Sequence, residues 1–552
     1  MKSSKIKKIF AAILAMAVSM TVVAACGSKT DSTKDKEKVK QTLVYNIGAD
    51  PKTVDPALNE AVDGSIIISN AFEGLCRLDK NDKAIPGVAK DWKISDDKLV
   101  YTFNLRDDAK WSDGKKVVAG DFEYAWKRAL DPKTGAAYAY QLYYLKGGEE
   151  YNVKNGKAEE VGVKAIDEKT LQVTLNSATP YFLELMAFPT YMPVRKDMVE
   201  SKGEAWARSA ETYISNGPFK LDKWSQQEKM VFVKNDNYWN KNDVKLDTLD
   251  IRLVTDEMTA YNELKAGNFD MTESIPIDML QDAKSAGLRQ DFANLGTYFI
   301  ALNVGKNFNK LDPKVQAVLG NEKVRQALSL AIDREAIVKN ITKAGQIPAY
   351  SFVPKGMEVV TGKDFADKEY YNVKGDLEKA KALLKEAGFP DGQGLPTLTF
   401  LFNSEGEGHK KIAQYIQDTW SKMGVKVELQ QQEWKVFQTS RNTGAYQIGR
   451  HGWSADYTDP MSFLDMWITN GGSNDAGFSN AEYDKLIDAT KKESDPAKRA
   501  ELFRKAEDIL MKEMPVIPLY FYTKVKGVKP QVKGFRVSPL GQVYFDQVQI
   551  DK

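Results

Sequence analysis

The order of helix and strand patterns across residues 376–429 constrains the fold of this chain more than any other feature. Helical and extended patterns alternate there: helical at 376–387, extended at 398–402, helical at 409–423 and extended at 425–429. Asp376 is a suitable N-cap for the first helix, and Gly388 is a suitable stop. Such alternation indicates an α/β lobe. Since 552 residues are too many for one hydrophobic core, we expect two or three lobes.

Shorter strand and helix patterns fill the rest of the chain, without a tandem repeat. The expected strands are 42–47, 99–105, 171–175, 249–253, 297–303, 516–522 and 543–548. The expected helices are 258–266, 321–331, 333–343, 481–491, 496–511 and 121–130, the last with Asp121 as its N-cap. The mixture supports an α/β class for the whole chain.

The first 25 residues predict export from the cytoplasm. Four lysines precede an apolar run over 9–25, as in a secretory signal peptide. The run ends in Val23-Ala24-Ala25-Cys26, which resembles a bacterial lipobox, so Cys26 is the expected site of lipidation. The alternative is an uncleaved membrane anchor, since 17 apolar residues are close to the shortest span of a bilayer. Both readings leave the protein tethered outside the cytoplasm.

The segment after the signal and the overall charge narrow the function further. Residues 26–41 are polar and lack aromatics, which predicts a flexible tether. The net charge is +2, and removing the four lysines of the signal leaves −2, which argues against a nucleic-acid binder. The only other cysteine, Cys76, has apolar neighbours and no disulfide partner, so we expect a small buried side chain and assign it no chemistry.

The segment 450–460 holds the strongest candidate for ligand binding. Asp456 lies between the aromatic residues Trp453 and Tyr457 and before a Thr-Asp-Pro turn. A carboxylate with such neighbours loses hydration when a cleft closes over it, and then needs a cation. We interpret Asp456 as the receptor for a ligand's ammonium group. The alternative is a solvated aspartate in a surface loop.

Several segments together resemble the extracytoplasmic peptide-binding proteins of bacterial ATP-driven importers, which are family 5 solute-binding proteins. The resemblance rests on 99–106, 111–114, 216–219, 235–239, 324–334 and, above all, 452–457. It implies a three-lobed α/β fold of the periplasmic-binding-protein type (type II, cluster C), with a ligand cleft between lobes one and three. The lobes implied are 42–72 with 200–272 and 524–552 for lobe one, 73–199 for lobe two, and 273–523 for lobe three.

The same resemblance implies a set of peptide contacts. Asp456 corresponds to the receptor of the peptide's ammonium group, and Gly452, Trp453 and Ser454 to residues beside its backbone. Trp434 corresponds to a pocket wall. The cations that receive the peptide's carboxylate correspond to Lys306, His409, Arg441 and Arg450. First-lobe and inter-lobe contacts correspond to Glu60, Val62, Tyr138 and Asp278, although the family pattern has Glu at the last position.

These residue types suit a zwitterionic ligand. A peptide rises roughly 3.3–3.6 Å per residue, so one fixed anion needs cations at graded distances to accept different lengths. Arginines can bind the carboxylate with two hydrogen bonds. Each basic residue alone could instead be solvated, His409 could be exposed, and the tryptophans could be plain core. The expected function is capture of short peptides, with little sequence preference, for delivery to a membrane permease by a monomer without metal or cofactor.

Three other functions stay open from the sequence. A metallopeptidase or serine hydrolase is disfavoured, because the only histidines, His409 and His451, are 42 residues apart and no Gly-x-Ser-x-Gly motif occurs. A surface receptor that passes peptides to signalling partners would have the same binding site. Other members of the superfamily bind dipeptides, nickel chelates, haem or oligosaccharides, but the Asp456 motif and the cation set favour oligopeptides.

Overall fold

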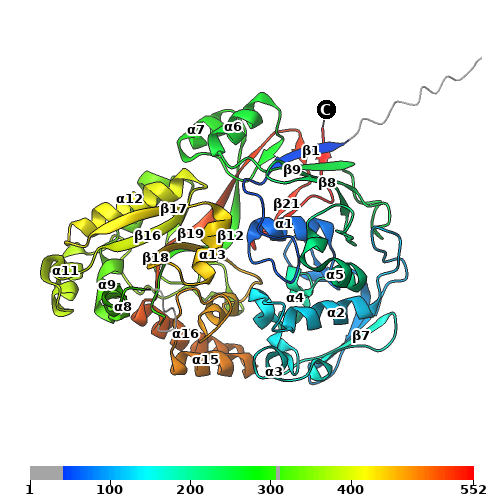
Figure 1. The fold of residues 1–552 in the computed structure, drawn as a ribbon, viewed down its shortest axis with the longest axis horizontal. Helices are drawn as coiled ribbons and strands as arrows, with labels where there is room; N and C mark the ends of the chain where they lie inside the picture. Colours follow the sequence, from blue (N-terminus) through cyan, green and yellow to red (C-terminus); the bar gives the residue numbers. More distant parts are fainter. Residues whose placement is uncertain (1–40, 306–310, 552) are drawn as a thin grey trace, which may run out of the picture. The chain divides into compact units, whose positions relative to one another are not determined.

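A computed structural model describes residues 41–305 and 311–551 of the chain (Figure 1). The predicted signal, Cys26, nearly all of the tether and Lys306 lie outside the described residues. The described residues belong to one unit of internal contacts. Within them, no helix combines the length and apolar character needed to cross a bilayer.

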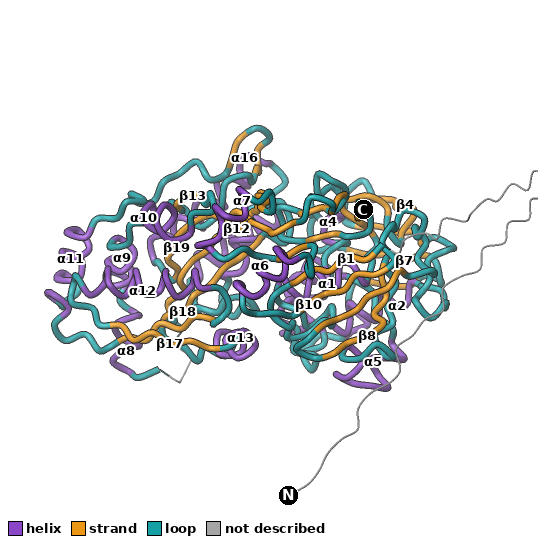
Figure 2. The backbone as a smooth tube through the Cα atoms, turned by 90° about the horizontal axis from the view of Figure 1, so that it is seen from above, coloured by secondary structure: helices purple, strands orange, loops and turns teal. Residues whose placement is uncertain are grey.

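A mixed sheet of eleven strands forms the framework of the fold. Its order along the sheet is β17 (Val427–Gln432), β16 (Leu398–Asn403), β18 (Ile448–Ser454), β12 (Arg289–Leu302), β19 (Val516–Val528), β11 (Met271–Thr272), β1 (Thr42–Asn46), β10 (Thr248–Arg252), β9 (Lys229–Lys234) and β8 (Phe219–Ser225). The last strand, β13 (Ile347–Pro348), pairs with β19. The long antiparallel pair of β12 and β19 lies between the strands of residues 398–454 and those of residues 42–272 (Figure 2).

The alternation that the sequence predicts at 376–429 is confirmed. Helix α11 (Leu377–Glu386), strand β16, helix α12 (Glu407–Ser421) and strand β17 follow one another. Strand β16 runs parallel to both β17 and β18, as expected when helices connect the strands. The Asp376 side chain accepts the backbone N–H of Lys379, which confirms the predicted N-cap.

The first half of the chain adds a separate antiparallel sheet of four strands. Its order is β4 (Ala89–Ile94), β5 (Val100–Leu105), β7 (Thr170–Thr174) and β6 (Val163–Ala165). Helix α2 (Ala119–Leu130) packs Phe122 and Trp126 into the core beside it. The prediction of Asp121 as the N-cap is wrong. The helix begins two residues earlier, and the Asp121 carboxylate accepts the N–H of Val118 from inside the first turn.

The remaining elements are shorter or lie around these sheets. The helices are α1 (Val62–Ala71), α3 (Gly148–Val153), α4 (Phe182–Leu185), α5 (Lys196–Lys202), α6 (Glu257–Ala266), α7 (Leu280–Ser285), α8 (Pro313–Gly320), α9 (Glu322–Leu330), α10 (Arg334–Ala336), α13 (Trp434–Asn442), α14 (Met461–Leu464), α15 (Ala481–Lys492) and α16 (Pro496–Glu513). The short strands are β2 (Cys76–Leu78), β3 (Ala84–Pro86), β14 (Glu358–Val360), β15 (Lys363–Asp364), β20 (Val532–Lys533), β21 (Arg536–Val537), β22 (Val543–Tyr544) and β23 (Gln549–Ile550). The strand expected at 543–548 is therefore only the two-residue strand β22.

Large aromatic side chains dominate the buried core. Five tryptophans are essentially inaccessible to solvent: Trp111, Trp126, Trp206, Trp420 and Trp467. The predicted burial of Cys76 is confirmed, and burial raises the pKa of its thiol. Packing on this scale holds the framework rigid on both sides of the site described next.

Candidate functional site

A cavity of about 400 Å³ brings together most of the residues that the sequence predicts as ligand contacts. Eleven of the thirteen line it: Glu60, Val62, Tyr138, His409, Trp434, Arg441, Arg450, Gly452, Trp453, Ser454 and Asp456. Lys306 lies outside the described residues. Asp278 lies away from the cavity lining, where its carboxylate pairs with Lys411 at 2.8 Å.

Asp456 follows the end of strand β18, and its carboxylate is held by two uncharged donors. The Gln141 side-chain amide donates at 2.8 Å, and the Tyr138 hydroxyl lies at 3.4 Å. The Asp456 backbone N–H donates to the Ser462 hydroxyl at 2.7 Å, which fixes the turn. Within 41–305 and 311–551, no Lys, Arg or His makes a salt bridge with Asp456. The carboxylate therefore faces the cavity without a cation.

This environment disfavours the charged form of Asp456. Burial raises the pKa of its carboxyl well above the ordinary value, and the nearby Asp465 raises it further. The bonds from Gln141 and Tyr138 oppose the shift only in part. A ligand that brings a positive charge to this point would remove the imbalance, so the site is suited to an ammonium group.

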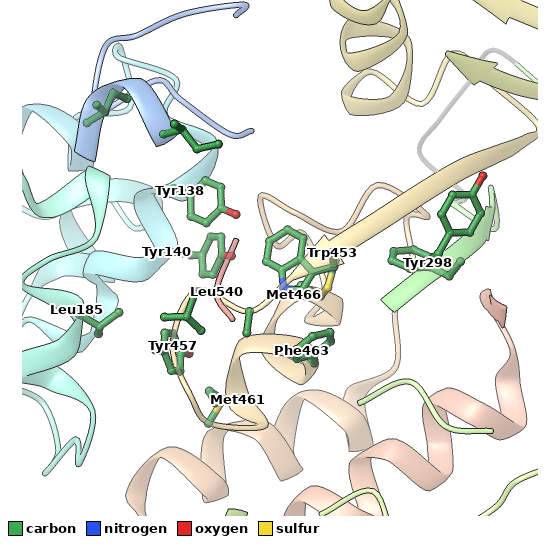
Figure 3. Close-up of a cluster of buried hydrophobic side chains, with 14 of the residues drawn as sticks. Tyr138, Tyr140, Leu185, Tyr298, Trp453, Tyr457, Met461, Phe463, Met466 and Leu540 are labelled. Carbon is green, nitrogen blue, oxygen red and sulfur yellow. The ribbon is translucent and has the colours of Figure 1, made fainter. Parts of the chain in front are cut away.

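Two stacked rings enclose the same end of the cavity. Trp453 and Tyr138 lie almost parallel, with ring centroids 6.1 Å apart, and Figure 3 shows them facing one another from different parts of the chain. The Trp453 indole N–H donates to the Ser462 carbonyl at 2.7 Å, and the residue is only 8% exposed. Trp453 is thus largely a core residue that also forms part of the cavity wall.

Strand β18 offers a free backbone edge beside Asp456. On one side it pairs with β12 along its length, but on the other side β16 reaches only Ile448 and Gly449. Among the described strands, none covers that second edge over 450–454, where the Gly452 backbone N–H donates to the His451 ring Nδ1 at 2.7 Å. A Cβ on Gly452 would lie 2.0 Å from the Tyr522 hydroxyl oxygen, so a larger residue here would have to displace the Tyr522 side chain. An extended ligand could pair with this edge as an added strand.

The two arginines of the site differ in their partners. Arg441 already has a salt bridge, with its Nε 2.8 Å from the Asp475 carboxylate, which also contacts His451. Arg450 lies with its guanidinium carbon 5.1 Å from the centre of the Tyr298 ring, and its buried Nε has no hydrogen-bond partner. No carboxylate among the described residues makes a salt bridge with Arg450. It is the better receptor for a ligand carboxylate.

His409 lies in surroundings that disfavour its charged form, while its role as a receptor for a ligand carboxylate stays a prediction. Its ring stacks on Tyr298, and its Nδ1 lies 3.1 Å from the Tyr298 hydroxyl. Burial, together with the charge of Arg450, lowers the pKa of His409 well below the ordinary value. The neutral imidazole can still donate or accept one hydrogen bond toward the cavity.

Residues 434–442 contact residues 50–63 across the cavity. The Trp434 indole N–H donates to Asp63 at 3.0 Å, and Asn442 donates to Glu60 at 2.7 Å. Lys435 forms a salt bridge with Asp50 at 2.9 Å. Trp434 is therefore both part of the lining and a bridge between segments nearly 400 residues apart. The described structure has this side of the cavity closed.

Sequence reasoning missed Gln141, Asp475 and Tyr298. Gln141 is the only side chain other than alanine, leucine and tyrosine in the segment Ala137–Tyr144, and this was the available signal. Asp475 becomes relevant only because folding brings it to Arg441. Within 41–305 and 311–551, no group of His, Cys, Asp or Glu is arranged to hold a metal ion.

Comparisons with known proteins show the family and the fold of the chain. Residues 83–475 match the family described as bacterial extracellular solute-binding proteins, family 5 Middle. The chain is 40% identical over 551 residues to the oligopeptide-binding protein OppA of Bacillus subtilis, covering 98% of this chain and 99% of that protein. The structure of Listeria monocytogenes OppA bound to peptide matches with a TM-score of 0.85 and 32% identity, covering 93% of this chain and all of that one.

Two structures of the murein tripeptide binding protein MppA match this chain to different degrees, and the difference bears on the conformation of this chain. The Escherichia coli structure matches with a TM-score of 0.86 at 34% identity, covering 93% of this chain and 99% of that one. An unliganded open form of MppA matches with a TM-score of only 0.62 at 33% identity, covering 93% and 98%. The described conformation thus differs from that open form, in line with the contacts across the cavity. The chain belongs to the bacterial extracellular solute-binding proteins of family 5, and it has their mixed α/β fold.

Proposed function

We propose that this protein captures short peptides outside the cytoplasm and delivers them to an ATP-driven membrane permease. The observation that carries the proposal is the Asp456 carboxylate, which faces the cavity without a cation partner among the described residues. Every unmodified peptide has a protonated amino end that fits this requirement. Peptide hydrolysis is not part of the proposed activity.

The peptide lies extended between its two charged ends. Its ammonium group binds Asp456, its backbone pairs with the free edge of β18 at 450–454, and its carboxylate binds Arg450. These contacts use groups that all peptides share. The side chains occupy the remaining cavity, where water can mediate their contacts.

Binding shifts the protein from an open to a closed population. Closure around an empty cavity leaves Asp456 and Arg450 buried without an oppositely charged partner among the described residues, which costs free energy. A zwitterionic peptide neutralises both, so the closed form becomes favourable only when it is loaded. We place the hinge where the chain passes between lobes one and three, near 272 and 524, with lobes 42–72 plus 200–272 plus 524–552, 73–199 and 273–523.

Calorimetry of a short unmodified peptide with the purified protein tests the proposal. A micromolar complex corresponds to about 8 kcal/mol, and loss of the Asp456 partner costs on the order of 3–5 kcal/mol. Asp456→Asn should therefore reduce binding below detection. Asp291→Asn, at an aspartate on β12 that pairs locally with Arg289, is the matched control and should bind like the unmodified protein. Unchanged binding by Asp456→Asn would contradict the proposal.

The protein is also proposed to be a monomeric lipoprotein. The sequence before residue 26 supports cleavage and diacylglyceryl modification at Cys26, and two acyl chains suffice for stable anchoring. Labelling with radioactive palmitate should mark the wild-type protein in the membrane fraction. Cys26→Ser should lose both the label and the membrane association. Label retained after the substitution would contradict the anchor.

A further inference from the structure

The charges that line the cavity do not balance, and the excess is negative. Its acids are Glu60, Asp63, Glu184, Glu257, Glu273, Glu405 and Asp456, and its permanent cations are Arg441, Arg450 and Lys524. Its two histidines, His409 and His451, have pKa values lowered by burial and are neutral at pH 7.

Several of these charges already have a partner of opposite charge in the protein. Glu60 pairs with Lys52 at 2.6 Å, and Glu184 pairs with Lys83 at 2.9 Å. Glu273 contacts both Lys526 and Lys524, and Arg441 contacts Asp475. In the part of the chain that the structure describes, four lining acids then lack a salt bridge: Asp63, Glu257, Glu405 and Asp456. Arg450 is the one lining cation without such a partner in the same residues.

A zwitterionic peptide without charged side chains would correct only part of this excess. Its ammonium group matches Asp456, and its carboxylate matches Arg450. Asp63, Glu257 and Glu405 remain, and we call these three residues the acidic wall. Because uncompensated charges inside a closed cavity are costly, the acidic wall calls for positive charge from the ligand.

Two acids of the acidic wall, Asp63 and Glu405, contact Trp434, and the third, Glu257, lies beside Gly406. Asp63 accepts the Trp434 indole N–H at 3.0 Å, and Glu405 accepts the Trp434 backbone N–H at 3.1 Å. Gly406 follows Glu405, and the Glu257 carboxylate lies 3.9 Å from the position that a Cβ on Gly406 would occupy. Burial raises the pKa of Asp63 to about 6 and raises that of Glu257 as well, as expected where no cation compensates.

Two buried amide oxygens beside the acidic wall point to the same kind of ligand independently of charge. Asn403 is 4% exposed, and its Oδ1 has no hydrogen-bond donor. Its Nδ2 donates to the Glu405 carbonyl at 2.9 Å, so the orientation of the amide is fixed. Gln438, one helical turn after Trp434 in α13, is 1% exposed, and its Oε1 also lacks a donor. Both residues line the cavity. Unsatisfied acceptors next to carboxylates suit a side chain that carries several N–H groups.

We propose that the cavity selects peptides with a lysine or arginine side chain, which binds at the acidic wall with Asn403 and Gln438 as neutral acceptors. This inference rests on the proposed peptide-binding function and specifies its substrate class. A glutamate side chain would face the same wall with repulsion. A norleucine side chain has the length of lysine but offers neither charge nor donors.

A calorimetric scan of peptides against the full chain tests the inference. Tetrapeptides of alanine carry lysine, norleucine or glutamate at each position in turn. We expect at least one position where lysine binds tenfold or more tightly than norleucine and where glutamate binds more weakly than both. A lysine-to-norleucine ratio near one at every position would overturn the inference and leave the proposed function intact. Binding of none of the peptides would overturn both.

Variants then locate the effect. Asp63→Asn, Glu257→Gln and Glu405→Gln should each reduce the lysine-to-norleucine ratio at the favoured position several-fold, while affinity for the norleucine peptide changes less. Glu184→Gln is the matched control, because this lining acid already pairs with Lys83, and it should keep the full ratio. Retention of the ratio in all three variants of the acidic wall would overturn the assignment.

Discussion

Asp456 and Asp459 lie three residues apart in one loop, yet their surroundings are opposite. Asp459 is 6% exposed and accepts two bonds from Arg499, at 2.6 and 2.8 Å. Asp456 faces the cavity and has only the neutral donors Gln141 and Tyr138. An acid with its own internal cation, as Asp459 has in Arg499, holds the loop in place. An acid without one is available to a ligand.

The largest expected effect separates the two acids by stability. Asp459→Ala leaves Arg499 buried without its partner, which should reduce the free energy of unfolding by about 3–5 kcal/mol. Because unfolding entropy scales with length, this corresponds to a fall in melting temperature on the order of 1 °C per kcal/mol. Scanning calorimetry of the ligand-free protein measures it. A melting temperature equal to that of the unmodified protein would break the comparison.

The same contrast applies to the arginines and predicts a smaller effect on binding. Arg450→Ala should weaken binding of a peptide with a free carboxylate by about 1.5–3 kcal/mol, because a charged hydrogen bond is lost. It should barely affect the same peptide with an amidated end. Arg441 already pairs with Asp475, so Arg441→Ala should act on stability and show no such dependence on amidation. Titration calorimetry of both variants with the free and the amidated peptide measures these effects. If amidation changed the affinity of both variants equally, the distinction between the two arginines would be contradicted.

The raised pKa of Asp456 predicts a pH dependence of capture. An ammonium ligand binds the ionised carboxylate, so affinity should fall as pH decreases through the raised pKa, approaching roughly tenfold per pH unit. Binding should also release protons, detectable by calorimetry in buffers of different ionisation enthalpy at one pH. Asp456→Gln should release none of these protons. Proton uptake on binding by the unmodified protein would have the wrong sign.

The smallest effect concerns the stability of the empty protein. Since the folded state raises the pKa of Asp456, its contribution to stability is present below the unfolded pKa and is lost as pH rises through the folded pKa. Asp456→Asn removes this loss. The melting temperature of the variant at pH 7 should therefore be the same as that of the wild-type protein or up to about 1 °C higher. At pH 4 the difference should shrink. A clear decrease at pH 7 would assign Asp456 a structural role like that of Asp459.

Local sequence patterns predicted many of the helices and strands. Which strands pair with one another could be seen only in the tertiary structure. The capped helix at 377–386 and the strand after it were predictable because apolar spacing and N-cap chemistry are local. Strand β12 was predicted only over its second half. The residues 289–296 lack an alternating pattern, and they are extended because β19 pairs with them.

The site shows the same limit. Asp456 could be predicted, since its aromatic neighbours are adjacent in the sequence. Asp475, the partner of Arg441, is 34 residues away in the sequence, and Gln141, which donates to Asp456, is 315 residues away. Neither pairing could therefore be predicted from local sequence. The neutral state of His409 likewise depends on burial beside Arg450.

The central claim is that Asp456 receives the amino end of a peptide. Calorimetry of one tetrapeptide, with a free amino end and after N-acetylation, tests it most directly on the unmodified protein. We expect acetylation to weaken binding by on the order of 3–5 kcal/mol, because Asp456 then stays buried without a cation. Equal affinity of the two forms would contradict the account.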